Sequence, residues 1–258
     1  MKKLLFPLFL CLSCVVAFAQ GKPQDVKPAD APKVEATLPT TKLDAKAAPL
    51  DIARAAFAAQ GGETYRKLKS LMVTGSLDVF SSTSTINISG RFVTITAGDK
   101  LRREINAPPA PFIRIISDGF NTYVSVPGVN MPPSSAYGMQ VFPHFDEKGF
   151  TVGALQGSEK KKRGFSVTTP EGTWTDFYVD AETSRINGYS FVYDGYVIGS
   201  EMKKHTVVNG VLVPYQYTEV LNLPLGTFYL EFKVKDAKTN VELAEDVFTF
   251  PANNKGVG

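Results

Sequence analysis

The residues that could do chemistry in this chain are few and scattered. The two histidines, His144 and His205, lie far apart and neither has a ligand-type neighbour with metal-site spacing. Ser200 stands in Ile-Gly-Ser-Glu, which lacks the flanking glycines of a nucleophile elbow. Asp176 and Asp180 flank a strand-to-turn segment, a position more typical of turn acids than of a catalytic pair. We therefore expect no enzymatic activity, no metal and no cofactor.

The pattern that could bind a ligand is apolar. From Phe228 to Val234 every second residue is apolar, and the residues between them are polar or aromatic, so one strand face is dry. The 18 Phe and 10 Tyr of the chain make the interior rich in bulky rings. Such rings either fill a barrel core or line an apolar cavity for an acyl chain. The cavity candidates, chosen by strand face, are Leu77, Ile88, Phe92, Phe112, Trp174, Phe228 and Phe232.

Strands separated by turns must position these side chains. Asp118-Gly119 and Asn209-Gly210 are typical of two-residue hairpin turns. The four prolines within residues 127–150 predict a long loop with at most short helical turns. Residues 243–250 predict a short helical turn followed by a final strand. The other expected strands span residues 72–80, 84–96, 100–106, 112–117, 122–126, 164–169, 173–179, 186–194, 197–208, 211–222 and 227–238.

Helix signals are confined to the region before the first strand. Residues 51–60 have an apolar side and end at Gly61-Gly62, which predicts a helix. About ten or eleven antiparallel strands with so little helix indicate a mainly β fold, a curled antiparallel sheet or unclosed β-barrel. The helix must bury its apolar side on that sheet, so we expect it to act as a lid through Ile52, Ala56 and Phe57.

The N-terminus has the pattern of a secretory signal peptide. Lys2 and Lys3 precede an apolar run, and Ala17-Phe18-Ala19 places small residues where a signal peptidase cleaves. We expect a signal peptide over residues 1–19 and a periplasmic mature protein. The alternative is lipid attachment at Cys14, which would anchor the protein to a membrane. A disordered Pro/Ala/Lys-rich linker is expected over residues 20–49, one domain over residues 50–252 and a flexible tail over residues 253–258.

The charge balance excludes one class of partner. Without residues 1–19 the chain has 26 basic and 25 acidic residues, which gives no electrostatic footprint for nucleic acid. One basic run stands out, formed by Lys160, Lys161, Lys162 and Arg163. It is either a solvated hairpin tip or a contact for anionic lipid headgroups at a membrane surface.

The order of several motifs resembles a known family. A helix ending in Gln60-Gly61-Gly62 is followed by Tyr65-Arg66-Lys67-Leu68-Lys69-Ser70-Leu71, and later by the segments FYVDAET at 177–183 and VNGVLVP at 208–214. The segment VKDAK at 234–238 and the Phe250-Pro251 pair complete the order. In this order the motifs resemble the LolA/LolB-like periplasmic outer-membrane lipoprotein-sorting proteins.

The resemblance implies an unclosed antiparallel barrel capped by helices, with an apolar cavity for lipoprotein acyl chains. Our first hypothesis is therefore an exported binding protein that holds lipid or the acylated end of a lipoprotein. The driving force would be apolar burial, roughly 0.8 kcal/mol for each CH₂ group removed from water. The alternative is an interaction or scaffold module of the cell envelope, with a filled barrel core and no ligand.

Overall fold

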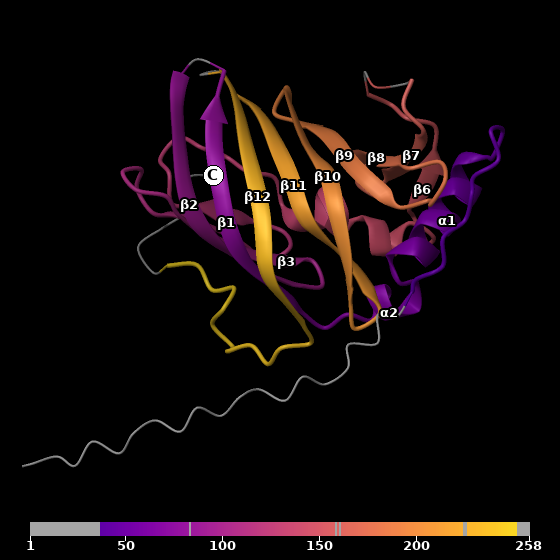
Figure 1. Cartoon of the computed structure of the whole chain (residues 1–258), viewed down its shortest axis with the longest axis horizontal. Coiled ribbons are helices and arrows are strands. Elements are labelled where there is room, and N and C mark those ends of the chain that lie inside the picture. The colour runs from indigo at the N-terminus through magenta and orange to yellow at the C-terminus, as the bar shows by residue number, and fades with distance from the viewer. Residues whose placement is uncertain (1–36, 83, 158, 160, 224–225, 252–258) are drawn as a thin grey trace, which may run out of the picture. The chain divides into compact units, whose positions relative to one another are not determined.

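One antiparallel sheet forms most of the structure, a computed structural model that describes residues 37–82, 84–157, 159, 161–223 and 226–251 (Figure 1). Its twelve described strands lie in the order β5-β4-β3-β2-β1-β12-β11-β10-β9-β8-β7-β6. The strands are β1 (Leu71–Ser81), β2 (Ser84–Ala97), β3 (Lys100–Asn106), β4 (Ile113–Ser117), β5 (Thr122–Val124), β6 (Thr151–Gly153), β7 (Gly164–Thr168), β8 (Trp174–Val179), β9 (Ile186–Tyr193), β10 (Tyr196–Val208), β11 (Val211–Leu223) and β12 (Gly226–Thr239).

Short helices lie beside the sheet. They are α1 (Pro49–Gln60), α2 (Glu63–Arg66) and the 3-10 helices η1 (Ser134–Ala136), η2 (Gly138–Gln140) and η3 (Phe142–His144). Helix α1 packs on β6, β7 and β11, and Figure 1 shows it next to the β6–β8 end of the sheet. Its buried side includes Ile52, Ala56 and Ala59, as the apolar spacing of the sequence predicts, and also Ala53.

Helix α1 ends at a glycine for two physical reasons. Gly61 has φ of 117°, in the left-handed region, and its N–H donates to the carbonyl of Ala58 at 3.1 Å. A Cβ atom at Gly61 would lie 2.3 Å from the carbonyl oxygen of Gly210, in the hairpin turn between β10 and β11. Only glycine therefore allows the end of α1 to approach that turn.

The sheet is not closed, because β5 and β6 do not pair within the described residues. These two edge strands follow each other in the sequence, and β1 pairs with β12 in the middle of the sheet. The chain between them, residues 125–150, therefore has to run from one edge of the sheet to the other. It carries η1, η2 and η3, and we call it the crossing segment.

The crossing segment lies against the inner face of the sheet. Ser134 Oγ donates to Ser117 Oγ of β4 at 2.9 Å, and the Gly138 N–H donates to Thr175 Oγ1 of β8 at 3.1 Å. Phe142 is fully buried, with its ring centroid 5.2 Å from that of Phe177 and 5.6 Å from that of Phe165. The segment thus bridges both halves of the sheet and supplies part of the core.

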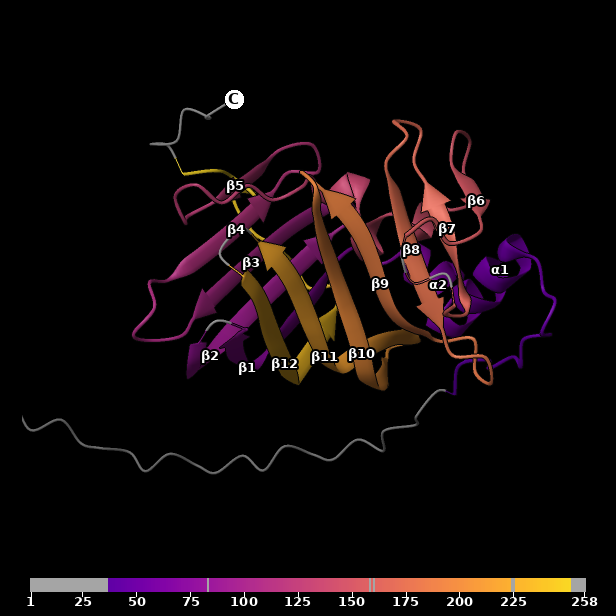
Figure 2. The same cartoon turned by 90° about the horizontal axis from the view of Figure 1, so that it is seen from above.

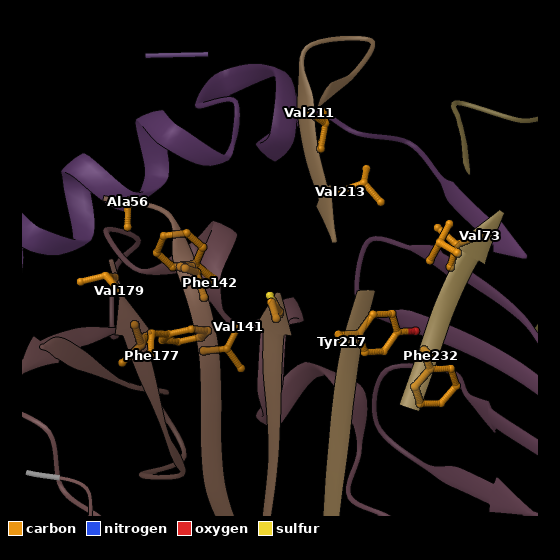
Figure 3. Packing of buried hydrophobic residues seen from close by; sticks show 14 of the residues in the cluster. Ala56, Val73, Val141, Phe142, Phe177, Val179, Val211, Val213, Tyr217 and Phe232 are labelled. Atoms are coloured by element: carbon orange, nitrogen blue, oxygen red, sulfur yellow. The ribbon is translucent and has the colours of Figure 1, made fainter. Parts of the chain in front are cut away.

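The core has two parts, which Figure 3 shows side by side. One surrounds Phe142 and includes Val141, Phe177, Val179 and Ala56 of α1. In the other part the Phe232 ring stacks on Tyr217, with 4.7 Å between centroids, and meets the edge of Phe92 at 4.8 Å. Alternation along β12 places Phe232 and Val234 inside and Lys233 and Lys235 outside, as predicted.

One further segment, residues 240–251, lies on the opposite face of the sheet. Residues 240–251 contact β3 and β5, where Arg102 Nη1 donates to the Val247 carbonyl at 2.8 Å and the rings of Tyr123 and Phe250 are 6.4 Å apart. These residues form turns, so the predicted final strand over residues 243–250 is wrong. The segment packs on the face of the sheet, over side chains of β3 and β5, and does not pair with the open edge of β5.

The chain before α1 makes specific contacts from residue 41 on. The Leu43 N–H donates to the Ala181 carbonyl at 2.8 Å, and Ser184 Oγ donates to the Thr41 carbonyl. Arg163 Nη1 donates to the Ala45 carbonyl at 2.9 Å. The predicted signal peptide (1–19), most of the predicted linker (20–49) and the predicted tail (253–258) lie outside the described residues, so those boundaries stay predictions.

The predicted fold class is confirmed: the protein is mainly β, with a curled, unclosed antiparallel sheet and a short N-terminal helix. Figure 2 shows the long strands β2, β1, β12, β11 and β10 next to one another, followed by β9 to β6 toward α1. The described strands number twelve instead of the expected ten or eleven. The expected loop over residues 127–150 contains only the three 3-10 helices, as predicted.

Truncating Phe142 tests whether the crossing segment is part of the core. We expect Phe142→Ala to lower the free energy of unfolding by about 3–5 kcal/mol, because it removes a buried ring and leaves a cavity. Phe120→Ala is the matched control: Phe120 is 82% exposed in the β4–β5 turn, and its truncation should change stability by less than about 0.5 kcal/mol. Urea denaturation measures the free energy of unfolding of both variants. A small change in both would contradict the conclusion that the crossing segment is part of the core.

Candidate binding cleft

A cleft of about 250 Å³ lies on the inner face of the sheet, between the crossing segment and the strands. Its walls come from α2 and from strands β1, β2, β3, β9, β10 and β11. Met139, Pro143 and His144 of the crossing segment form another side. The cleft therefore exists because residues 125–150 stand off from the long strands instead of packing flat on them.

Most of the cleft wall is apolar. The apolar lining residues are Leu68, Leu71, Val73, Leu101, Met139, Pro143, Met202, Val211, Leu212, Val213 and Pro214. Val73, Val211 and Val213 belong to the buried core and are labelled in Figure 3. A wall of this kind removes an apolar ligand from water, and the polar side chains that also line the cleft, among them Thr94, Gln140 and Ser200, are available to fix its orientation.

A buried ion pair lies in the cleft. Arg103 Nη1 of β3 and Glu219 Oε2 of β11 are 2.7 Å apart, and their side chains are 14% and 13% exposed. Arg103 Nε also donates to Thr94 Oγ1 at 3.1 Å, and the guanidinium lies 5.1 Å from the centroid of the Phe232 ring. Arg103 thus has a carboxylate, a hydroxyl and a ring as partners, which fix its position.

This pair spans a long stretch of sheet. Strands β2, β1 and β12 lie between β3 and β11, so the two backbones are four strand spacings apart, roughly 19 Å along a flat sheet. The side chains meet only because the sheet curls toward its inner face. Arg103 and Glu219 therefore hold the curl, and Leu101, Gln140 and Tyr189 join them in lining a second hollow of about 100 Å³.

Two cationic residues at the cleft are each paired with two carboxylates. Arg66 of α2 donates to Glu63 at 2.8 Å and to Asp146 at 2.6 Å, and its Nε donates to the Pro143 carbonyl at 2.9 Å. His144 of η3 lies 3.3 Å from Asp99, in the β2–β3 turn, and 2.9 Å from Glu147. These contacts tie α2 and the β2–β3 turn to the crossing segment.

The pKa of His144 reflects that pairing. The hydrogen bond to Asp99 raises the pKa of His144 to about 9, burial opposes the shift, and the carboxylate of Glu147 adds to it. Burial raises the pKa of Tyr189 and of Tyr217, two further residues of the cleft, above its ordinary range. At neutral pH the cleft thus holds an imidazolium and neutral phenols.

One polar atom of the cleft has no partner within the described residues. Gln60, the last residue of α1, is 2% exposed, and its Oε1 accepts no hydrogen bond there. Gln60 also lines the cleft. A buried amide oxygen without a partner is unfavourable by about 1–3 kcal/mol.

The structure brings some of the predicted cavity residues together, away from this cleft. Leu77, Phe92 and Phe232 are at most 2% exposed and pack together in the core, and Ile88 packs against the same cluster. Phe228 is half-buried on β12. None of these side chains lines the two hollows described above. They form the floor on which the cleft-lining residues rest, and a direct role in binding stays a prediction.

Two other candidates lie elsewhere. Phe112 is 46% exposed just before β4 and packs against the guanidinium of Arg114, 5.4 Å from the ring centroid. Trp174 is on the face of β8 opposite to Phe177, where Gly157 lies against its ring. Strand alternation gives both residues a face, but it does not tell which face of an edge region another segment will cover.

The predicted lid residues all contact the core. Ile52 and Ala56 are 2% and 0% exposed, and the Phe57 ring packs against Phe142, Phe145 and Arg66. These three side chains cover the Phe142 part of the core, and the end of α1 reaches the cleft through Gln60. The role of these residues as a lid stays a prediction.

Two residues of the basic run, Lys162 and Arg163, make contacts within the chain. Lys162 pairs with Glu159 at 3.5 Å and lies 4.7 Å from the centroid of the Tyr178 ring, and Arg163 binds the carbonyls of Asp44 and Ala45. Lys161 is exposed, and Lys160 lies outside the described residues. A membrane-surface contact of this run stays a prediction.

The described part of the chain lacks two other features. No group of three or more His, Cys, Asp or Glu residues is placed to hold a metal ion. In the same residues, no helix combines the length and the apolar character required to span a bilayer.

Arg103, Glu219 and Gln60 were not among the predicted site residues. A signal for the first two was present: Arg103 stands between Leu101 and Ile105 on the dry face of its strand, and Glu219 between Tyr217 and Leu221 on the dry face of another. A charged residue on an apolar strand face needs a buried partner. The partner itself is 116 residues away, and no local pattern identifies it.

The arrangement of the sheet and its covering helices is found in solved structures. The structure of a LolA superfamily protein from Nitrosomonas europaea is similar to it with a TM-score of 0.50 and 15% sequence identity, covering 79% of this chain and 98% of that one. The protein thus has a LolA-like fold. No protein-family model and no curated protein matches the sequence.

Two other similar structures have lower scores. A DUF1329 family protein from Desulfovibrio piger has a TM-score of 0.48 and 8% identity over 78% of this chain and 98% of its own. A putative outer membrane lipoprotein-sorting protein domain from Vibrio parahaemolyticus has a TM-score of 0.45 and 12% identity over 78% of this chain and 96% of its own.

The raised pKa of His144 predicts a pH dependence of stability. A pKa that is higher in the folded state, about 9 against 6.5, stabilises the fold fully below about pH 6.5, and this contribution is lost as the pH rises through about 9. We expect the unfolding free energy to fall over that window and His144→Gln to remove this part of the decrease. Urea denaturation between these pH values measures it.

The comparison with His144→Gln isolates one residue, because both proteins keep His205. Burial lowers the pKa of His205, so its contribution is lost as the pH falls and has the opposite direction. Parallel pH profiles of the wild type and His144→Gln would show that the contact between His144 and Asp99 is absent in solution.

Proposed function

We propose that this protein is an exported, periplasmic binding protein, and not an enzyme, that holds an acyl chain of a lipid or lipoprotein in the cleft between the crossing segment and the long strands. The observation that supports this most is the apolar wall of the cleft, built from Val73, Met202 and Val213 among others. The LolA-like fold supports the proposal of acyl-chain binding, but it does not identify the ligand, because one fold supports many functions.

The size of the cleft favours a single chain. Its volume, about 250 Å³, is just below the roughly 300–1,000 Å³ of typical ligand pockets. Each CH₂ group buried there contributes roughly 0.8 kcal/mol, so a medium-length chain gains enough for micromolar binding. A second chain would require the crossing segment or α1 to move away from the sheet. The alternative function, an envelope scaffold with a filled core, does not require an apolar hollow.

Filling the cleft tests the proposal. We expect Val213→Phe to weaken the binding of 1-monolauroylglycerol at least about tenfold, because Val213 is buried in the cleft wall and a ring there occupies the space of the chain. Displacement of the neutral fluorescent probe N-phenyl-1-naphthylamine measures it. The matched control is Val197→Phe, since Val197 is 43% exposed on β10 and lines neither hollow.

Thermal unfolding establishes first that each variant folds. If Val213→Phe does not fold, Val73→Phe on β1 fills the same cleft from the other side. A wild-type protein that binds neither the probe nor monolauroylglycerol, or a Val213→Phe protein that binds both normally, would contradict the proposed function.

A further inference from the structure

Every cation that lines the cleft, among the described residues, has a carboxylate partner. The largely buried Arg103 pairs with Glu219, 2.7 Å away. At the rim, Arg66 pairs with Glu63 and Asp146, and His144 pairs with Asp99 and Glu147, while Lys67 also pairs with Glu63 at 3.6 Å. These four carboxylates do not line the cleft themselves, but they neutralise the cations that do.

This balance has a consequence for the ligand. A free fatty acid carries a carboxylate, which would enter a cleft whose cations are already paired with carboxylates. If it bound the remaining N–H groups of Arg103, it would lie beside the carboxylate of Glu219, and two like charges so close together in a largely buried site repel each other. A neutral headgroup meets no such opposition.

The unpartnered Oε1 of Gln60 points to the same ligand chemistry. Gln60 lines the cleft, and this oxygen is buried without a hydrogen-bond donor among the described residues. At neutral pH a fatty acid has no donor in its headgroup, whereas a glyceryl hydroxyl or an amide N–H has one. A neutral acyl compound with a donor close to its chain thus satisfies both the charge balance and the free acceptor.

We propose that the cleft selects neutral acyl ligands with a hydrogen-bond donor, of the acylglycerol or N-acyl type, and excludes free fatty acids, and that Glu219 determines this selectivity by neutralising Arg103. This inference rests on the proposed function, since it names the chemical class of the acyl ligand. Glu219 acts here as a specificity-determining residue that keeps a buried guanidinium from recruiting an anion.

The experiment compares two ligands with the same twelve-carbon chain and different charge. Displacement of N-phenyl-1-naphthylamine at pH 7.5 is measured with 1-monolauroylglycerol and with lauric acid, below their micellar concentrations. For the wild type we expect monolauroylglycerol to bind at least about tenfold more tightly than lauric acid. Glu219→Gln leaves Arg103 unpaired, and we expect the affinity for lauric acid relative to that for monolauroylglycerol to rise about tenfold above the wild-type ratio. The ratio is the readout, because a change in the shape of the cleft acts on the shared twelve-carbon chain of both ligands.

The matched control is Glu104→Gln on the opposite face of β3. Glu104 also pairs with arginines, Arg102 at 2.6 Å and Arg114 at 3.0 Å, but it lines neither hollow. This variant should keep the wild-type preference. If Glu219→Gln does not fold, the double variant Arg103→Met with Glu219→Gln leaves no unpaired buried charge, and it should bind lauric acid no better than the wild type does.

The outcomes separate the two proposals. Equal binding of both ligands by the wild type, or an unchanged preference in folded Glu219→Gln, would overturn the role of Glu219 and leave the acyl-binding function standing. A gain in lauric acid affinity in the double variant would also overturn it, because that gain would not come from Arg103. Failure of the wild type to bind the probe and both ligands would remove the proposed function itself.

Discussion

The position of two strands in the sheet constrains the rest of the structure: β5 and β6 are neighbours in the sequence and lie at opposite edges of one open sheet. The chain that joins them has to cross the inner face, and it does so with apolar side chains at Val141, Phe142 and Phe145, which are at most 3% exposed. Without these contacts the inner face of a twelve-stranded sheet would be exposed to water. The crossing segment is thus both the connection and part of the core.

The same constraint accounts for the cleft and its electrostatics. The crossing segment fills the concave side over β7 and β8, but it stands off from β1, β2 and β11, where the cleft lies. The pair of Arg103 and Glu219 bridges that space and sets how far the sheet curls there. An ion pair inside an apolar hollow has two effects: it fixes the shape of the hollow, and it limits the charge of the ligand that can enter.

Much of the fold could be predicted from local patterns. The Asn209-Gly210 turn has both residues at positive φ, as its sequence requires, and the alternation from Phe228 to Val234 gives the correct inner face. Strand β6 was not predicted because three residues after a proline-rich loop have no period of their own. The final strand was predicted wrongly because an apolar segment packed across a sheet looks locally like one paired within it.

The site could be predicted only in outline. An apolar inner face follows from the strand pattern, but the location of the hollow depends on where residues 125–150 pack, and this contact is not encoded in any strand. Trp174 is an example. Its strand, β8, has buried residues on both faces, among them Asp176 and Phe177, so the apolar pattern of β8 does not show which face is the inner one. The partnership of Arg103 with Glu219 depends on the curl of the whole sheet.

The central claim is that an acyl chain lies in the cleft next to the crossing segment. Photocrosslinking with a monoacylglycerol that carries a diazirine at the end of its chain, followed by proteolysis and mass spectrometry, tests this most directly. The account predicts that the label attaches to peptides containing Met139, Met202 or Val213 and that excess monolauroylglycerol prevents it. Labelling confined to the outer face, at residues 241–251 or at the β9–β10 hairpin, or labelling that monolauroylglycerol does not reduce, would contradict it.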